Sequence, residues 1–233
     1  MTIPKIVHLT WKNRHLPPPY ETILRHNEAM SPGYRFVLYS DEDLDRLFAG
    51  AGNDLCEAYR RLNFGQARAD LFRALILWQH GGVYLDVKIR CRTPIDRWLR
   101  MDSDALWYSY WDGLWFNRDH LENEWGEIQN WVIASPAGHE VLRDYLETTT
   151  RRILNATRME RFTLCGKEGV VLLTGPVAYT RVLERHPEKT RRFRSVDHLD
   201  YGSSFHGLDD THYSRSTEPV LLIERDRLAE LTQ

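Results

Sequence analysis

Short apolar runs alternate with helical patterns from residue 3 to residue 61. Apolar runs at Ile3 to Trp11 and at Tyr34 to Tyr39 predict two strands. Ser40, followed three residues later by Asp43, resembles a capping box in which Asp replaces the usual Glu. Helices are expected at Tyr20 to Met30, Ser40 to Phe48 and Asn53 to Arg61. Alternating strands and helices predict an α/β fold with a parallel sheet.

The stretch from Phe64 to Lys88 has the strongest pattern in the chain. Apolar residues at spacings of three and four form one helical stripe: Phe64, Ala67, Leu71, Ala74, Leu75 and Trp78. Gly81 and Gly82 are expected to stop this helix, because glycine adopts the left-handed cap conformation without strain. An apolar strand follows and ends at Asp86. Because open α/β sheets bind ligands beyond the carboxyl ends of their strands, Asp86 is a candidate site residue.

The pattern is looser after Lys88. A polar stretch from Asp112 to Gly126 predicts a loop that could lie over a site, and Ser203 to Ser216 is rich in His and Asp. Helices are expected from Ser135-Pro136 to about Arg152, and from Val177 to Glu184. Further strands are predicted at Ala105 to Trp111, Trp131 to Ala134, Phe193 to Val196 and Pro219 to Ile223.

The composition describes an ordinary soluble globular protein, with 42% hydrophobic and 27% charged residues in 233 positions, which indicates one domain. A net charge of −2 gives no reason to expect nucleic acid or an anionic membrane as a partner. The three cysteines lack C-x-x-C spacing, which argues against a disulfide framework and a structural zinc site. No apolar run approaches the roughly eighteen residues of a membrane span, and no signal peptide is evident, so we expect a cytoplasmic location.

The central stretch carries a recognisable motif, a helix with A-x-x-D-x-x-R followed by G-G-[IV]-Y-[LM]-D-x-D. The matching positions are Ala67, Asp70, Arg73, Gly81, Gly82, Val83, Tyr84, Leu85 and Asp86. This resembles the signature of the DxD-containing sugar-nucleotide glycosyltransferases of family 32. The resemblance breaks at the last motif position, where Lys88 stands in place of the second Asp.

The resemblance implies a single domain over residues 1–233 with a GT-A type fold, a mixed, mostly parallel sheet flanked by helices. Residues 1 to about 100 would bind the nucleotide-sugar, and residues from about 101 to 233 would form the acceptor side and a closing loop. The implied reaction moves a sugar from a UDP- or GDP-sugar to a hydroxyl acceptor, with retention at the anomeric carbon. Two alternatives remain, a nucleotide-binding pseudoenzyme, suggested by Lys88, and a nucleotide-sugar hydrolase.

Asp70 and Arg73 are the first pair of candidate catalytic residues. Taken alone, they could be an i,i+3 ion pair on the helix surface, worth only a few tenths of a kcal/mol. In the resembled family, residues at these positions hold hydroxyls of the donor sugar, and the Arg helps to balance phosphate charge. A carboxylate can accept two sugar hydroxyls, and the planar guanidinium fork suits oxygen anions. The resemblance favours this second role.

Asp86 is the third candidate catalytic residue and the expected ligand of a divalent cation, Mn²⁺ or Mg²⁺, that would bridge the donor phosphates. The second Asp of such a motif would point to the same side of an extended backbone, and Lys88 has that position here. Asp86 could hold the metal with help from a C-terminal His or carboxylate. Alternatively, the Lys88 ammonium could replace part of the metal charge, or the protein could be a weak or inactive relative. The first account is favoured.

The remaining candidates contact the donor or the metal only by resemblance. Thr10 and Trp11 would lie at the end of the first strand, where the nucleotide base stacks, although a Trp there is otherwise an ordinary core residue. Tyr84 would lie beside the diphosphate or serve packing. Asn130 would face the sugar or the acceptor. His212, in the late His- and Asp-rich segment, would complete the metal shell or contact phosphate, although these residue types also suit a solvated loop.

Overall fold

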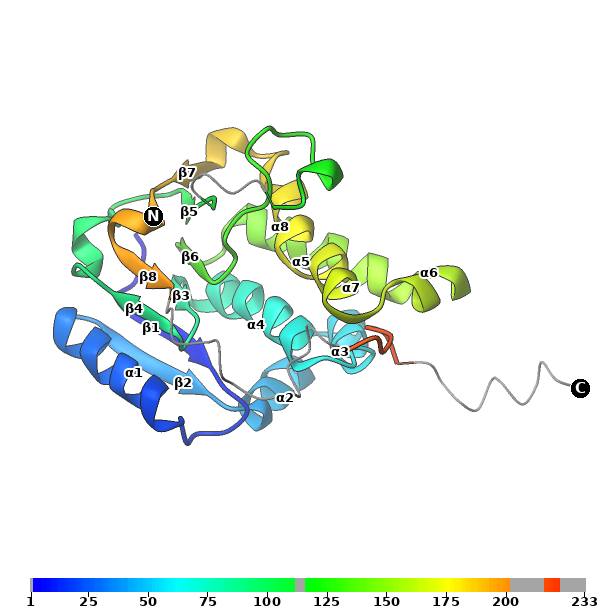
Figure 1. Cartoon of the computed structure of the whole chain (residues 1–233), viewed down its shortest axis with the longest axis horizontal. Coiled ribbons are helices and arrows are strands. Elements are labelled where there is room, and N and C mark those ends of the chain that lie inside the picture. Colours follow the sequence, from blue (N-terminus) through cyan, green and yellow to red (C-terminus); the bar gives the residue numbers. More distant parts are fainter. Residues whose placement is uncertain (1, 112–115, 202–215, 223–233) are drawn as a thin grey trace, which may run out of the picture.

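The computed structural model describes residues 2–111, 116–201 and 216–222, which form a mixed sheet between two layers of other elements (Figure 1). The six-stranded sheet has the order β2-β1-β3-β6-β5-β7. Its strands are β1 Ile6–Thr10, β2 Arg35–Tyr39, β3 Gly82–Leu85, β5 Leu106–Tyr108, β6 Val132–Ser135 and β7 Thr190–Arg192. β1 pairs in parallel with β2 and β3, and β5 with β7, whereas β6 runs antiparallel to β3 and β5. The predicted mixed, mostly parallel sheet is confirmed.

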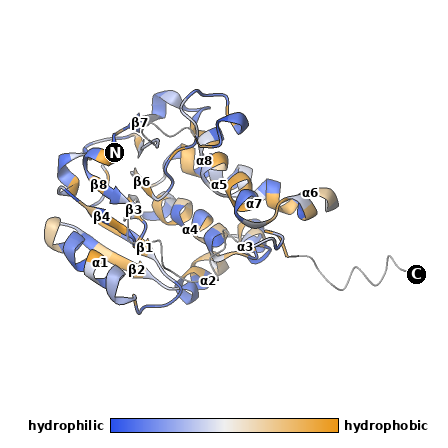
Figure 2. Ribbon diagram, viewed as in Figure 1, coloured by the Kyte–Doolittle hydropathy of each residue, from blue (hydrophilic) through white to orange (hydrophobic). Residues whose placement is uncertain are grey.

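Helices cover one face of the sheet more heavily than the other. The helices are α1 Pro18–Met30, α2 Asp41–Ala49, α3 Asn53–Arg60, α4 Gly65–His80, α5 Glu140–Leu154, α6 Arg158–Thr163, α7 Gly166–Leu173 and α8 Pro176–Leu183. A second, antiparallel pair of strands, β4 Ile89–Cys91 and β8 Leu199–Tyr201, lies on the side of α1. In Figure 2 the helices carry both blue and orange residues, as expected for elements with one apolar face.

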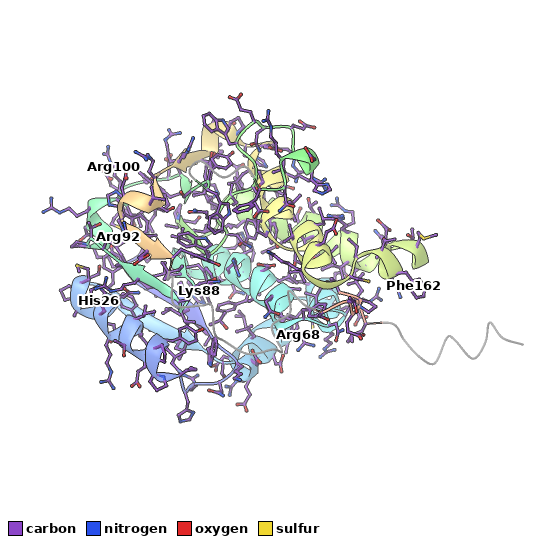
Figure 3. The ribbon with its side chains drawn as sticks, viewed as in Figure 1. His26, Arg68, Lys88, Arg92, Arg100 and Phe162 are labelled. Carbon is purple, nitrogen blue, oxygen red and sulfur yellow. The ribbon has the colours of Figure 1, made fainter. Side chains whose placement is uncertain are left out.

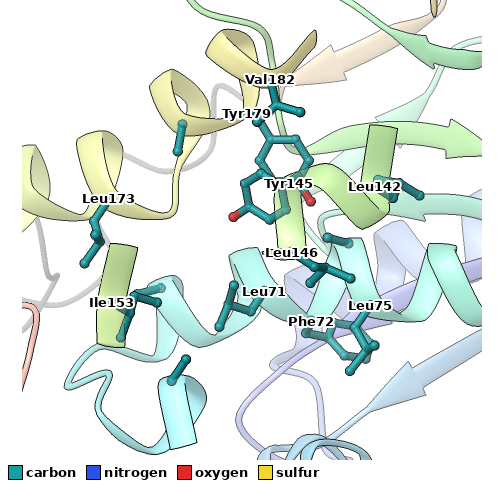
Figure 4. Close-up of a cluster of buried hydrophobic side chains, with 14 of the residues drawn as sticks. Leu71, Phe72, Leu75, Leu142, Tyr145, Leu146, Ile153, Leu173, Tyr179 and Val182 are labelled. Carbon is teal, nitrogen blue, oxygen red and sulfur yellow. The ribbon is translucent and has the colours of Figure 1, made fainter. Parts of the chain in front are cut away.

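Two hydrophobic cores lie on opposite faces of the sheet. Because side chains alternate along a strand, Val83 and Leu85 join the core beneath α1 and β4, whereas Tyr84 joins the core beneath α4. Figure 3 adds the side chains and labels Phe162 on α6 and Lys88 near the middle of the view. Figure 4 shows apolar side chains from α4, α5, α7 and α8 meeting in the larger core. This packing holds α4 directly against the sheet.

The two glycines between α4 and β3 end the helix as expected. Gly81 and Gly82 have φ values of 64° and 107°, which favour glycine. A Cβ on Gly82 would lie 2.6 Å from the Ile6 carbonyl oxygen, and one on Gly81 would lie 2.6 Å from the Ala137 nitrogen. Gly81 has a ψ of −169°, so its conformation differs from the expected left-handed helical cap. The pair lets β3 start between β1 and β6 as soon as α4 ends.

Local predictions in the first half agree closely with the structure. Ser40 and Asp43 form the predicted capping box at the start of α2, with the Ser40 backbone N–H donating to the Asp43 carboxylate at 2.9 Å. The expected helix at Tyr20 begins earlier, at Pro18, because proline is tolerated in a first helical turn. No helix of the described residues is long and apolar enough to cross a membrane.

Several predictions in the second half are wrong. Ser135 does not begin a helix but ends β6, opposite Gly82, and α5 starts only at Glu140, capped by the His139 ring. Gly138, at a φ of 73°, separates the two elements. The strand expected at Phe193 to Val196 is also incorrect, because β7 ends at Arg192 and Phe193 stacks on the Trp98 ring at 4.7 Å. Of the expected strand at residues 219–223, the described part makes only isolated bridges. Helices α6 and α7 and strand β8 were not expected.

Candidate functional site

The candidate site lies at the edge of the sheet where β1 and β3 end and β6 begins. Because β1 and β3 are parallel, Thr10 and Leu85 bring their carboxyl ends to the same edge. Because β6 is antiparallel to β3, Asn130 and Trp131 reach that edge before β6 starts. The Asp86 backbone N–H donates to the Trp131 carbonyl oxygen at 3.0 Å, which joins the two segments.

Asp70 and Arg73 form a buried ion pair on α4, only 4% and 6% exposed, so the surface alternative is excluded. Arg73 Nη2 lies 3.2 Å from Asp70 Oδ1. The same oxygen accepts a hydrogen bond from Asn130 Nδ2 at 2.9 Å, and Asp70 Oδ2 accepts one from Thr174 Oγ1 at 3.0 Å. A buried carboxylate is costly unless it is paired in this way. The fold therefore fixes the Asp70 side chain from three elements of the chain.

Burial also sets the protonation of this pair. It raises the pKa of the Asp70 carboxyl to about 7, against the opposing effects of Arg73, Thr174 and Asn130. Burial alone would lower the pKa of Arg73, but Tyr84, Asp70 and Asp86 together keep that pKa above its ordinary value. Arg73 therefore stays charged, and among the three groups it favours the ionised form of Asp70 most strongly.

Arg73 links Asp70 to Asp86 across the site. Its guanidinium lies 4.6 Å from the centroid of the Tyr84 ring, and Nη2 lies 3.9 Å from Asp86 Oδ1. Arg73 Nη1 also donates a short hydrogen bond to the Asn130 carbonyl oxygen. The Tyr84 hydroxyl donates to Asp86 Oδ1 at 2.8 Å, and its ring is buried. Tyr84 therefore both packs in the core and orients Asp86.

Lys88 lies on the other side of the Asp86 carboxylate. Asp86 and Lys88 belong to a turn closed by the Ile89 backbone N–H on the Asp86 carbonyl oxygen at 2.9 Å, so the extended backbone expected there is wrong. The two side chains still meet, with Lys88 Nζ 3.5 Å from Asp86 Oδ2. Lys88 Nζ also donates to the Tyr201 hydroxyl at 3.0 Å. Asp86 is thus flanked by a cation at each oxygen.

Thr10 and Trp11 lie on the neighbouring strand end. The Thr10 hydroxyl donates to the Tyr39 carbonyl oxygen at 3.2 Å, and the Trp11 backbone N–H donates to the same oxygen at 3.0 Å. The Trp11 ring is half-buried and 5.0 Å from the Tyr20 ring. Its indole N–H is buried without a hydrogen-bond partner among the described residues. Trp11 therefore contributes to the core at this edge of the sheet.

The structure brings six sequence-predicted residues into one connected group, and Thr10 and Trp11 lie on the adjacent strand end. The six are Asp70, Arg73, Tyr84, Asp86, Lys88 and Asn130. His212 lies outside the described residues. Thr174 and Tyr201 were missed as site residues, and Tyr201 stands beside no motif.

The sequence predicts a divalent cation at Asp86. Within residues 2–111, 116–201 and 216–222, no three His, Cys, Asp or Glu side chains gather as metal ligands. Lys88 and Arg73 flank Asp86, and the Tyr84 hydroxyl donates to the same carboxylate. Cations on both sides of a carboxylate oppose the approach of a third. The expected role of His212 as a ligand stays a prediction.

The charges at this edge suit an anionic ligand that also carries hydroxyl groups. Arg73 and Lys88 offer guanidinium and ammonium donors, and both groups bind phosphate oxygens well. The carboxylates of Asp70 and Asp86 offer acceptors for hydroxyl groups. Such a combination can hold a phosphate and an adjacent sugar.

Comparison with known proteins agrees with this chemistry. Residues 18–104 match the family described as the glycosyltransferase sugar-binding region containing a DXD motif. Inositol phosphoceramide mannosyltransferase 3 of Schizosaccharomyces pombe is 31% identical over 109 residues, covering 44% of this chain and 31% of that protein. The initiation-specific alpha-1,6-mannosyltransferase of Candida albicans is 29% identical over 163 residues, covering 63% of this chain and 42% of that protein. The chain thus spans less than half the length of these curated relatives.

Solved structures confirm the expected GT-A type fold. The PaToxG glycosyltransferase aligns with a TM-score of 0.60 at 13% identity, covering 80% of this chain and 71% of that one. The UDP-bound glycosyltransferase domain from the YGT toxin aligns with a TM-score of 0.58 at 8% identity, covering 82% and 80%. At these identities the likeness concerns the fold alone.

Proposed function

We propose that this protein transfers a sugar from a nucleoside diphosphate sugar to a hydroxyl acceptor, because residues 18–104 match the family of DXD-containing glycosyltransferase sugar-binding regions. The observation that carries the proposal is the buried chain of Asp70, Arg73 and Asp86 at the carboxyl edge of the sheet. A site that places a guanidinium between two carboxylates offers contacts to both the sugar and the phosphate next to it.

In this proposal Asp70 holds Arg73 and contacts the sugar with what remains of its accepting capacity. A carboxylate has about four acceptor positions, and Asn130, Arg73 and Thr174 approach Asp70 from within the protein. A donor-sugar hydroxyl would take the position that is left. The tight network fixes the carboxylate before the sugar arrives, so little ordering is required on binding.

Arg73 and Lys88 would meet the diphosphate, with the Asp86 carboxylate between them holding both cations in place. The departing diphosphate gains negative charge, and preorganised positive groups stabilise it. The resemblance implies retention at the anomeric carbon, with attack from the face of the leaving group and the departing phosphate as base. Such a reaction requires no nucleophile from the protein. Thr10 and Trp11 would hold the nucleotide base at the end of β1, as the resemblance implies.

Four expectations remain predictions from the sequence. They are the divalent cation, the ligand role of His212, the division of the domain near residue 100, and the cytoplasmic location. The nucleotide of the donor, UDP or GDP, is likewise a question for experiment. The names of the yeast relatives favour including mannosyl donors in any test, and the UDP-bound toxin domain favours including UDP-sugars.

The test is a panel of UDP- and GDP-sugars, GDP-mannose among them, with nucleoside diphosphate release measured with and without Mn²⁺ and with and without a simple glycoside acceptor. A transferase releases more product when an acceptor is present. A hydrolase releases it equally without one. A pseudoenzyme binds a donor without release, and that outcome, motivated by Lys88 beside Asp86, would contradict the proposal.

Asp86→Asn is the matched variant for this panel, since it keeps the size of the side chain and removes its charge. We expect release to fall by about 100-fold, because Arg73 and Lys88 would lose the carboxylate that positions both cations at the reacting diphosphate. Circular dichroism should show an unchanged fold because Asp86 is only half-buried. Full activity in a folded Asp86→Asn variant would place the reaction elsewhere.

A further inference from the structure

Lys88 occupies a defined position at the Asp86 carboxylate, and this position has a consequence for the diphosphate. We propose that the Lys88 ammonium supplies positive charge to the donor diphosphate in place of a divalent cation, so that the protein binds nucleoside diphosphates without metal. The inference rests on the proposed function, because it assigns the diphosphate to the same edge of the sheet. The sequence alone favoured a different account, in which Asp86 holds a divalent cation, and the experiment must distinguish the two.

The position of Lys88 is fixed by strand β4, which follows it, and by Tyr201 on strand β8. Lys88 immediately precedes β4, and Tyr201 ends β8 opposite Ile89 in the antiparallel pair. Lys88 Nζ donates to the Tyr201 hydroxyl at 3.0 Å and lies 4.7 Å from the centroid of the Tyr201 ring. Figure 3 shows Lys88 beside the end of β8, near the middle of the molecule in that view. The ammonium is therefore a positioned charge rather than a side chain extended into solvent.

Lys88 also lies between the two ends of the proposed donor site. On one side is Asp86 Oδ2, 3.5 Å from Nζ, and beyond Asp86 lies Arg73. On the other side is Tyr20, whose pKa is raised by burial and lowered in turn by the nearby Lys88 charge. The Tyr20 ring contacts Trp11 at the end of β1. A diphosphate that joins a base near Trp11 to a sugar near Asp70 would therefore pass the Lys88 ammonium.

The charge balance at Asp86 favours an anion here over a second cation. The partly exposed Asp86 carboxylate faces two cations, Arg73 and Lys88, whereas the second carboxylate paired with Arg73, that of Asp70, is buried. A divalent cation on Asp86 would have to approach two fixed positive groups, whereas a diphosphate would be attracted by them. A Lys ammonium has three donors in flexible directions and binds phosphate as a point charge. Lys88 and Arg73 can thus supply the positive charge that a divalent cation would otherwise bring to the diphosphate.

The experiment measures binding of UDP and GDP by isothermal titration calorimetry, in excess EDTA and then with Mn²⁺. For the natural protein we expect Kd values that differ by less than about twofold between the two conditions. In EDTA, Lys88→Met should weaken binding by about 10-fold to 100-fold, the value of one charge-assisted hydrogen bond. Arg90→Met, which removes an exposed positive charge two residues away, should leave Kd within about twofold and serves as the control.

The reciprocal variant is Lys88→Asp, which creates two acidic residues at D-x-D spacing. It should bind UDP or GDP poorly in EDTA, and its affinity should rise at least about 10-fold with Mn²⁺. The variant would thus gain a metal dependence that the natural protein lacks. Natural protein that binds only with Mn²⁺, or Lys88→Met that binds as well as the natural protein in EDTA, would overturn the inference. Metal-free binding without transfer would contradict the proposed function alone. Folded protein that binds no UDP or GDP under any condition would contradict both.

Discussion

The two ends of the candidate site differ in how the fold supports them. At the Asp70 end, a carboxylate and a guanidinium are buried and held by Asn130 and Thr174. At the Lys88 end, the ammonium and Tyr201 are partly exposed, with side chain exposure of 28% for Lys88. The first end is part of the core, so a change there affects stability and function together. The second end lies nearer the surface, and this is where the chain departs from the motif.

The largest effect is expected from Arg73→Met. It leaves the Asp70 carboxylate buried without its charged partner, and breaking a buried pair typically costs about 3–5 kcal/mol. We expect the free energy of unfolding, measured with urea, to fall by about that amount, and donor binding to be lost. Arg25→Met is the matched control, because Arg25 forms an exposed pair with Glu21 on α1 and its loss should cost at most about 0.5 kcal/mol. An equal fall in the free energy of unfolding for both variants would show that the Asp70–Arg73 pair contributes no more to stability than an exposed pair.

An intermediate effect is expected in the pH dependence of Asp70→Asn. Burial raises the pKa of Asp70 to about 7 in the folded protein, whereas in the unfolded chain it is near its ordinary value of about 4. The folded state therefore binds more protons between these values, and this site contributes less stability as pH rises from about 4 to 7. Relative to Asp70→Asn, the free energy of unfolding of the natural protein should fall by at most about 1.4 kcal/mol for each pH unit in that window.

Urea unfolding of both proteins at several pH values between 4 and 7 measures this difference. The Asn variant keeps the shape of the side chain and does not titrate, so all other groups cancel in the comparison. Parallel stability curves for the two proteins would show that the Asp70 carboxyl is not perturbed and that Arg73 fully compensates its burial.

The smallest effect is expected from Tyr201→Phe at the exposed end. This change removes the hydroxyl that accepts from Lys88 Nζ and keeps the ring below the ammonium. A single hydrogen bond of this kind contributes about 0.5–1.5 kcal/mol, so metal-free binding of UDP or GDP should weaken by roughly 2-fold to 10-fold. Tyr201→Leu should weaken it further because the ring contact is lost as well. Unchanged Kd values for both variants would show that Tyr201 does not position Lys88.

The sequence predicted the parts of the fold that local rules determine. The apolar stripe of α4, the stop at Gly81 and Gly82, and the short strand that leads to Asp86 follow from spacing and glycine chemistry. The capping box at Ser40 follows from two residues alone. In contrast, α5 begins later than predicted because Ser135 pairs with Gly82, and nothing in the local sequence specifies that pairing.

The site residues likewise fall into those that the local sequence predicts and those that only the structure reveals. Asp70, Arg73 and Asp86 could be found from the motif because they lie within one short stretch of chain. Thr174 contacts Asp70 across 104 positions, and Tyr201 contacts Lys88 across 113, each as a single residue with no spacing pattern of its own. The motif also indicated that residue 88 differs, but the position of its ammonium between Asp86 and Tyr201 required the three-dimensional arrangement.

The most direct test is a crystal structure with whichever UDP- or GDP-sugar of the panel binds. The account predicts that the sugar lies against Asp70 and Arg73, and that the diphosphate lies within hydrogen-bonding distance of Lys88 Nζ. A nucleotide-sugar bound away from this edge, for example in the groove between α3, α4 and α5 lined by Trp78 and Leu146, would contradict it.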